Sequence, residues 1–298
     1  MSAGTAAGEL PRFHPDLARR RLTGTLFLGA CIAAIGITLL VLLFLLLDIA
    51  GKGIPGLTLD FLTHGPSRKP AQAGVLPALV GSIEMALLVG LFTFPFGVGA
   101  AIWLREYAGD RRLTRLLRTN IANLAGVPSI VYGIFGLALF VRGLALGFTV
   151  VAGALTLSLL ILPVVIIASI EALDAVPAGQ REGAYALGAT RWQMVRRAVL
   201  PAAGPGILTG IILAMARAIG ETAPLILVGA VGFVSYLPTP FEGGYTVLPI
   251  QAYQWASRPQ DEFQALAASS IIVILALLFV LNILAVAIRI RLTRHLQW

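Results

Sequence analysis

A charged segment with the sequence REGAYALGATRWQMVRRAVLPAAGPG runs from Arg181 to Gly206, between two long apolar stretches. Within it, Gly188 suits the left-handed residue that follows the C-terminus of a helix. Thr190, with Gln193 three residues later, forms a capping box that begins a second helix. The segment is therefore predicted to contain two short helices, the second of which ends before Pro201.

The rest of the chain has the composition of a membrane protein. Of its 298 residues, 58% are hydrophobic and 12% are charged, whereas soluble domains carry about 25% charged residues. A transmembrane helix needs about 20 apolar residues. Six runs meet this requirement: 25–47, 76–103, 121–141, 148–170, 204–230 and 264–288.

Each run is predicted to be a helix, because an open sheet leaves backbone groups unpaired in lipid and a barrel shows alternating segments of about ten residues. We therefore expect an all-α polytopic membrane protein with six transmembrane helices, five transmembrane helices and one peripheral helix being the alternative. A single domain is predicted over 25–290, with tails at 1–24 and 291–298.

Arginine gathers on one side of the six predicted spans, in both tails and in the second and fourth connections. Because positive charge is retained on the cytoplasmic side, both termini are predicted to be cytoplasmic. The segment 171–203 then forms the longest cytoplasmic loop. The net charge of +8 follows from this topology, so we expect no nucleic-acid partner.

Apolar side chains recur on this charged loop at helical spacing. Ala184 and Leu187 share one face of the first predicted helix, and Trp192 lies on the second. An exposed apolar patch indicates a docking partner. Packing of the same side chains against the bundle's own cytoplasmic end explains the pattern equally well, so the residues alone leave both interpretations open.

The loop resembles the signature of ABC importer permeases, which reads E-A-A, three residues, G, nine residues and I-x-L-P. The positions that match are Glu182, Ala184, Gly188, Leu200 and Pro201. Gly183 and Ala198 depart from the pattern, replacing an alanine and an isoleucine. The resemblance implies a type I (MetI-like) permease fold, in which 171–203 is a coupling loop that sits in a cleft of a cytoplasmic ATPase. The residues implied in ATPase coupling are Glu182, Ala184, Leu187, Gly188, Trp192, Leu200 and Pro201.

Three further stretches, Ala122–Val141, Ala216–Leu227 and Ile250–Ala268, resemble permeases of bacterial phosphate importers, and the last resembles the PstA-type subunit. This resemblance implies import of inorganic phosphate across the bacterial cytoplasmic membrane. It also implies a homologous PstC-like permease, two PstB-like ATPases and an extracytoplasmic PstS-like binding protein as partners. Molybdate, sulfate or another small solute remain alternative substrates.

The sequence contains no G-x-x-x-x-G-K-[ST] loop, so ATP and Mg²⁺ are expected on a separate ATPase chain and no cofactor on this one. The three histidines lie in tails or an outer loop without metal-ligand spacing, and no Ser-His arrangement is evident. We therefore expect neither a metal site nor an enzyme active site. A self-sufficient secondary transporter is a further alternative, for which a midplane site of broken helices is expected.

Three charged side chains fall inside the predicted spans, where each costs about 2.5–3.5 kcal/mol to insert. Arg217 and Glu221 are four residues apart, and are predicted to share one face of the fifth span. One interpretation is a translocation pathway in which Arg217 meets an anion and Glu221 offsets its charge; the other is a static pair that locks two helices. Glu84, near the outer end of the second span, is a weaker candidate for the pathway.

Prolines and glycines are predicted to kink the third and fifth spans, where they supply hinges or close packing. The positions are Pro128, Pro205, Gly220 and Pro224.

Overall fold

The computed structural model describes residues 17–109, 111–230 and 233–293. The chain forms two compact units, Met1–Asp48 and Ile49–Trp298. Helix α1 (Leu17–Gly53) supplies the described part of the first unit. Among the described residues the regular structure is helical, apart from one isolated bridge between Ala230 and Tyr245. The all-α prediction is confirmed, whereas the tails predicted at 1–24 and 291–298 lie largely outside the described residues.

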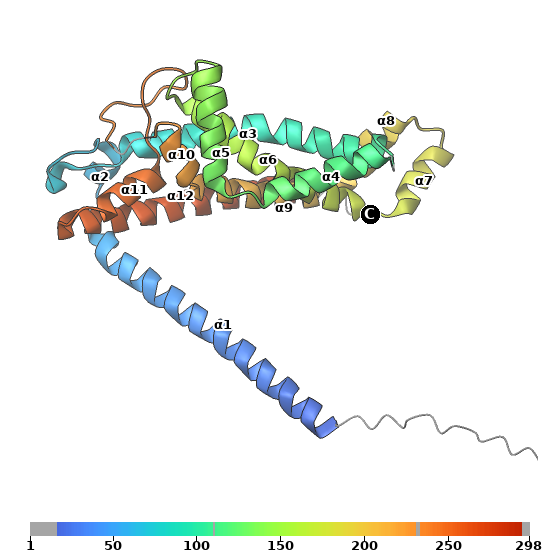
Figure 1. Cartoon of the computed structure of the whole chain (residues 1–298), viewed down its shortest axis with the longest axis horizontal. Helices are drawn as coiled ribbons and strands as arrows, with labels where there is room; N and C mark the ends of the chain where they lie inside the picture. The colour runs from blue at the N-terminus through green and yellow to red at the C-terminus, as the bar shows by residue number, and fades with distance from the viewer. Residues whose placement is uncertain (1–16, 110, 231–232, 294–298) are drawn as a thin grey trace, which may run out of the picture. The chain divides into compact units, whose positions relative to one another are not determined.

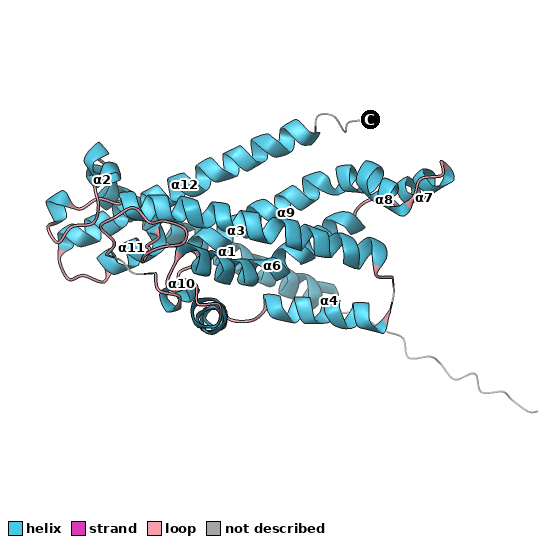
Figure 2. Cartoon of the chain, turned by 90° about the horizontal axis from the view of Figure 1, so that it is seen from above, coloured by secondary structure: helices cyan, strands magenta, loops and turns pink. Residues whose placement is uncertain are grey.

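The second unit is a bundle of long helices with short helices at both ends. Its elements are α2 (Leu59–Thr63), α3 (Leu76–Ile102), α4 (Arg112–Ala125), α5 (Ser129–Gly136), α6 (Val150–Asp174), α7 (Ala178–Ala186), α8 (Arg191–Met194), α9 (Leu200–Gly220), α10 (Ala223–Leu227), α11 (Leu248–Ala256) and α12 (Asp261–Thr293). Figure 1 shows α3, α6 and α9 lying along a common axis, with α2 and α11 at one end of the bundle and α7 and α8 at the other. The view from above in Figure 2 agrees.

Five helices among the described residues are long and apolar enough to cross a membrane, and a sixth span exists only if a bent pair counts as one. That pair is the predicted span 121–141, which is not a single straight helix. The chain bends by 101° between its two parts, Arg112–Ala125 and Ser129–Gly143. Figure 1 shows α5 running across the direction of α4.

Backbone chemistry explains this bend. Gly126 follows the end of α4, and Pro128 immediately precedes α5, where its missing N–H costs nothing. The carbonyl of Leu124, left free by the helix end, accepts hydrogen bonds from the Val127 amide at 3.1 Å and from the Tyr132 hydroxyl at 2.9 Å. The bend is therefore stabilised from within the chain, as lipid requires.

Helix α6 is the centre of the bundle. In its most apolar stretch 72% of the residues are buried, against 39% for α3 and 22% for the helix that contains α9. Small residues allow its neighbours to approach closely: a Cβ on Gly97 of α3 would lie 2.7 Å from Val165, and one on Gly210 of α9 would lie 2.5 Å from Ala168. Such contacts hold membrane helices together, because lipid provides no hydrophobic force between them.

The fifth predicted span differs from the structure at both ends. The second loop helix does not end before Pro201: α8 continues through a π-helical segment, Val195–Val199, into α9. The π turn changes the hydrogen-bond register just before Pro201. The helix can therefore continue although proline has no amide to donate. At the other end α9 stops at Gly220, short of the predicted 230.

Replacing Gly97 by leucine should disrupt the contact between α3 and α6, because the new side chain would overlap Val165. Overpacking of this kind costs about 1–3 kcal/mol. The matched control is Gly99→Leu on the same helix, where a Cβ meets nothing within 4 Å. Thermal unfolding of the purified protein in detergent should show a lower midpoint for Gly97→Leu alone. Equal midpoints for the two variants would contradict this close packing of α3 on α6.

Candidate functional site

The turn between α7 and α8 in the coupling loop (171–203) has the local structure that its sequence predicts. Helix α7 ends before Gly188, whose φ of +79° is the left-handed conformation expected of it. Its amide donates to the Tyr185 carbonyl at 2.9 Å. The capping box of α8 is formed in both directions: the Gln193 amide donates to Thr190 Oγ1 at 3.3 Å, and the Thr190 amide donates to Gln193 Oε1 at 2.8 Å.

The tip of the coupling loop presents apolar side chains away from the bundle. Leu187 is 90% exposed and Trp192 is 58% exposed. Ala184, by contrast, is half-buried against the apolar cluster at this end of the bundle. Packing on the bundle's own end therefore explains Ala184 but not Leu187 or Trp192.

A groove of about 390 Å³ lies between α7 and the start of α9. Its lining residues are Gly179, Gln180, Gly183, Ala184, Leu187, Arg197, Ala198, Pro201 and Ala202. Of the other predicted coupling residues, Glu182 and Gly188 are exposed, and Leu200 packs into the neighbouring apolar cluster. Of the seven predicted coupling residues, the groove is thus lined by Ala184, Leu187 and Pro201.

The base of the loop contains an ion pair that the sequence interpretation missed. Arg181 of α7 contacts Glu106, which lies in the π-helical segment Trp103–Tyr107 that follows α3, with 2.9 Å between Nη2 and Oε1. The two side chains are 15% and 5% exposed, respectively. Removing one partner of such a buried pair costs about 3–5 kcal/mol. The available signal was a glutamate within the arginine-rich second connection.

The predicted pair of Arg217 and Glu221 is formed, with 3.4 Å between Nε and Oε1. However, Glu221 is not on the helix: it follows the last residue of α9 in an extended conformation. The pair therefore spans the end of α9 rather than one helical face. The Arg217 side chain is 48% exposed on the surface of this chain, whereas that of Glu221 is 17% exposed.

Glu84 is not a member of this ion pair. It lies on α3, half-buried, and its Oε2 atom is enclosed without a hydrogen-bond partner. A place for Glu84 in the pathway stays a prediction.

The four predicted kink positions fall at helix ends more often than inside helices. Pro205 lies within α9, whereas Pro128 precedes α5 and Gly220 is the last residue of α9. Pro224 lies in the first turn of α10 and packs against Gly133 of α5. Two short helices, α5 and α10, thus lie together beside the break at Glu221.

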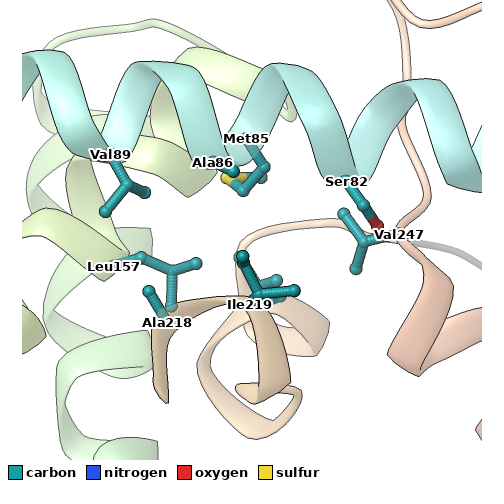
Figure 3. A pocket seen from close by; sticks show the side chains of 9 residues that line it. Ser82, Met85, Ala86, Val89, Leu157, Ala218, Ile219 and Val247 are labelled. Carbon is teal, nitrogen blue, oxygen red and sulfur yellow. The ribbon is translucent and has the colours of Figure 1, made fainter. Parts of the chain in front are cut away.

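The space between α3, α6, α9 and α10 is almost completely filled. A cavity of about 10 Å³ remains (Figure 3), which is enough for one water molecule at most. The residues around it are Ser82, Met85, Ala86, Val89, Leu157, Ala218, Ile219, Leu225 and Val247. This cavity is too small for an oxyanion such as phosphate.

Residues 93–294 match the model of a protein family described as the binding-protein-dependent transport system inner membrane component. The chain belongs to this family. It is thus a transport permease, and its long apolar helices are those of an integral membrane protein.

Relatives of this permease are similar over most of its length. The phosphate transport system permease protein PstA of Xylella fastidiosa strain Temecula1 is 35% identical over 80% of this chain and 83% of its own length. The phosphate transport system permease protein PstA 1 of Mycobacterium tuberculosis strain CDC 1551 is 33% identical over 95% of this chain and 94% of its own length.

Among solved structures, the permease resembles a chain of the MetNI methionine ABC transporter in an inward-facing conformation. The TM-score is 0.62 at 19% identity, over 74% of this permease and 96% of that chain. At this identity the likeness concerns the fold alone. The predicted type I (MetI-like) permease fold is confirmed.

Replacing Gly188 by alanine should loosen the turn between α7 and α8, because the left-handed conformation costs a residue with a side chain roughly 1–2 kcal/mol. Gly183→Ala in the middle of α7 is the matched control, since nothing lies within 4 Å of its Cβ and its φ is negative. It should stabilise the helix by about 0.5–1 kcal/mol. Hydrogen exchange of the amides at 183–190 should be faster in the first variant and slower in the second. Changes in the same direction would show that the left-handed turn at Gly188 does not hold the two helices in place.

Proposed function

We propose that this permease is the PstA-like subunit of an ATP-driven importer of inorganic phosphate in the bacterial cytoplasmic membrane. The observation that carries the proposal is the exposed apolar tip of the coupling loop, a docking surface that a self-sufficient transporter does not need. The substrate is inferred from the relatives named as phosphate transport system permeases.

The energy source is a separate ATPase. Two PstB-like subunits would bind ATP and Mg²⁺, because this sequence has no phosphate-binding loop of the Walker type. One of them would receive α7, with Leu187 and Trp192 as its apolar contacts and Glu182 beside them. Aromatic and apolar anchors of this kind dominate the binding energy of protein interfaces.

The translocation pathway would lie between this permease and a homologous PstC-like partner. Half of the Arg217 side chain is on the surface of the chain, and a guanidinium that faces lipid is costly. A second subunit and a hydrated path between the two would cover it. There Arg217 would meet the phosphate, and Glu221 would offset its charge so that the anion is released.

The membrane orientation follows from charge. The arginine-rich ends of the bundle, including the coupling loop, would be cytoplasmic together with both termini. The opposite end, formed by α2 and α11 (Figure 1), would then face the PstS-like binding protein.

Leu187→Asp should abolish copurification of the ATPase without destabilising the permease, because the side chain is 90% exposed. Loss of one apolar anchor should weaken binding by roughly tenfold or more. The matched control is Leu237→Asp, which changes a leucine that is 54% exposed in the segment before α11. Normal ATPase yield with Leu187→Asp would refute the docking assignment.

Arg217→Gln should reduce phosphate uptake by roughly tenfold or more, the scale of one lost hydrogen bond to a charged group. Glu221→Gln should have a milder effect or slow the passage of phosphate, because it leaves Arg217 uncompensated. Uptake is measured per assembled complex, which separates transport from assembly.

The double variant Arg217→Gln with Glu221→Gln distinguishes a pathway from a structural lock. A lock would lose stability in both single variants and regain function when both charges are removed together. Recovery of uptake in the double variant would therefore exclude the pathway role of Arg217.

A further inference from the structure

Three consecutive residues at the cytoplasmic end of α3 each contact a different part of the coupling loop. The pairs are Arg105 with Asp174, Glu106 with Arg181, and Tyr107 with Arg191. The partners belong in turn to the end of α6, to α7 and to the first residue of α8. The short segment that follows α3 thus contacts the residue before the loop helices, the first loop helix α7 and the second loop helix α8.

Arg181 makes the most extensive of these contacts. Its Nε and Nη2 atoms donate to Glu106 Oε1 at 3.2 and 2.9 Å. The same guanidinium donates to the carbonyls of Val176 and Leu173 at 2.7 Å each. Because the guanidinium is planar and its donors are fixed, four bonds in three directions determine its position. Arg181 therefore holds α7, the end of α6 and the end of α3 at set distances.

The contact matters because of how the chain is connected. Helix α8 continues into α9, so a displacement of the loop reaches α9 through the backbone. Helix α3 has no such connection, since α4, α5 and α6 separate it from the loop in sequence. The side-chain contacts at 105–107 are direct links between the loop and α3.

We propose that Glu106 and Arg181 are positioning residues that make α3 move together with the docking helix α7. The proposal rests on the proposed docking of an ATPase to the coupling loop. Movement of α7 by the ATPase would then reach α3 and α9 together, and these two helices contribute Ser82, Ala218 and Ile219 to the cavity of Figure 3.

Burial indicates that this pair is a fixed link rather than a switch. Glu106 is 5% exposed and Arg181 15% exposed, so separation would leave charges without partners in a region of low dielectric. A contact that opened in every transport cycle would need water or another partner for each group. The pair is therefore expected to persist while the loop and α3 move as one body.

Glu106→Ala should uncouple transport from hydrolysis. The ATPase should still copurify, because the tip of the loop is unchanged, but the number of phosphate ions imported per ATP hydrolysed should fall by about tenfold, within the usual range of coupling between sites. The matched control is Glu262→Ala, which removes an exposed glutamate from the first turn of α12, outside the coupling loop. Reconstituted complexes in vesicles, supplied with radiolabelled phosphate and ATP, give both rates.

A cross-link tests whether the pair moves as one body. In a Cys31→Ser background, Glu106→Cys with Arg181→Cys removes the ion pair, and a bifunctional thiol reagent that spans the two side chains then restores a connection. Phosphate imported per ATP should be low before treatment and should recover after it. A purely structural defect would leave this ratio unchanged and lower only the yield of complex.

Two outcomes would overturn the proposal: an unchanged ratio of uptake to hydrolysis in Glu106→Ala, or inhibition of transport by the cross-link, which would show that the residues must separate. Failure of the docking assignment itself has a different signature, because the ATPase would then copurify normally with Leu187→Asp.

Discussion

Hydrocarbon supplies no hydrogen-bond partners, and this constraint determines where the chain can depart from a regular helix. At the bend between α4 and α5, the Leu124 carbonyl accepts bonds from Val127 and Tyr132. The break after α9 is followed within two residues by α10, which packs against α5. Two breaks in the long helices thus lie close together, around α5, α10 and Glu221. The charged pair of Arg217 and Glu221 lies at the same place.

Helix α6 connects this region to the coupling loop. Close contacts at Gly97 and Gly210 join α3 and α9 to it along the bundle, and at its C-terminal end the carbonyls of Leu173 and Val176 accept hydrogen bonds from Arg181. Van der Waals packing thus predominates along its length and charge-assisted hydrogen bonds at its end. The three long helices are in this way tied together both along the bundle and next to the coupling loop.

Local sequence predicted local structure well. The capping box at Thr190 and the left-handed turn at Gly188 depend on a few neighbouring residues, and both are present as expected. Long apolar runs likewise predicted most of the membrane helices.

The sequence predictions were wrong or incomplete where contacts between distant residues decide the structure. Helical spacing placed Glu221 on α9, but the helix ends at Gly220 beside α5 and α10. The partner of Arg181 is 75 residues away in the sequence, and no local pattern identifies it.

The filled space between α3, α6, α9 and α10 bears on how a solute can cross. With about 10 Å³ left there, a solute larger than a water molecule does not fit between these four helices as they stand. Passage between them therefore requires the helices to separate, and separation has to break the close contacts that Gly97 and Gly210 make with α6.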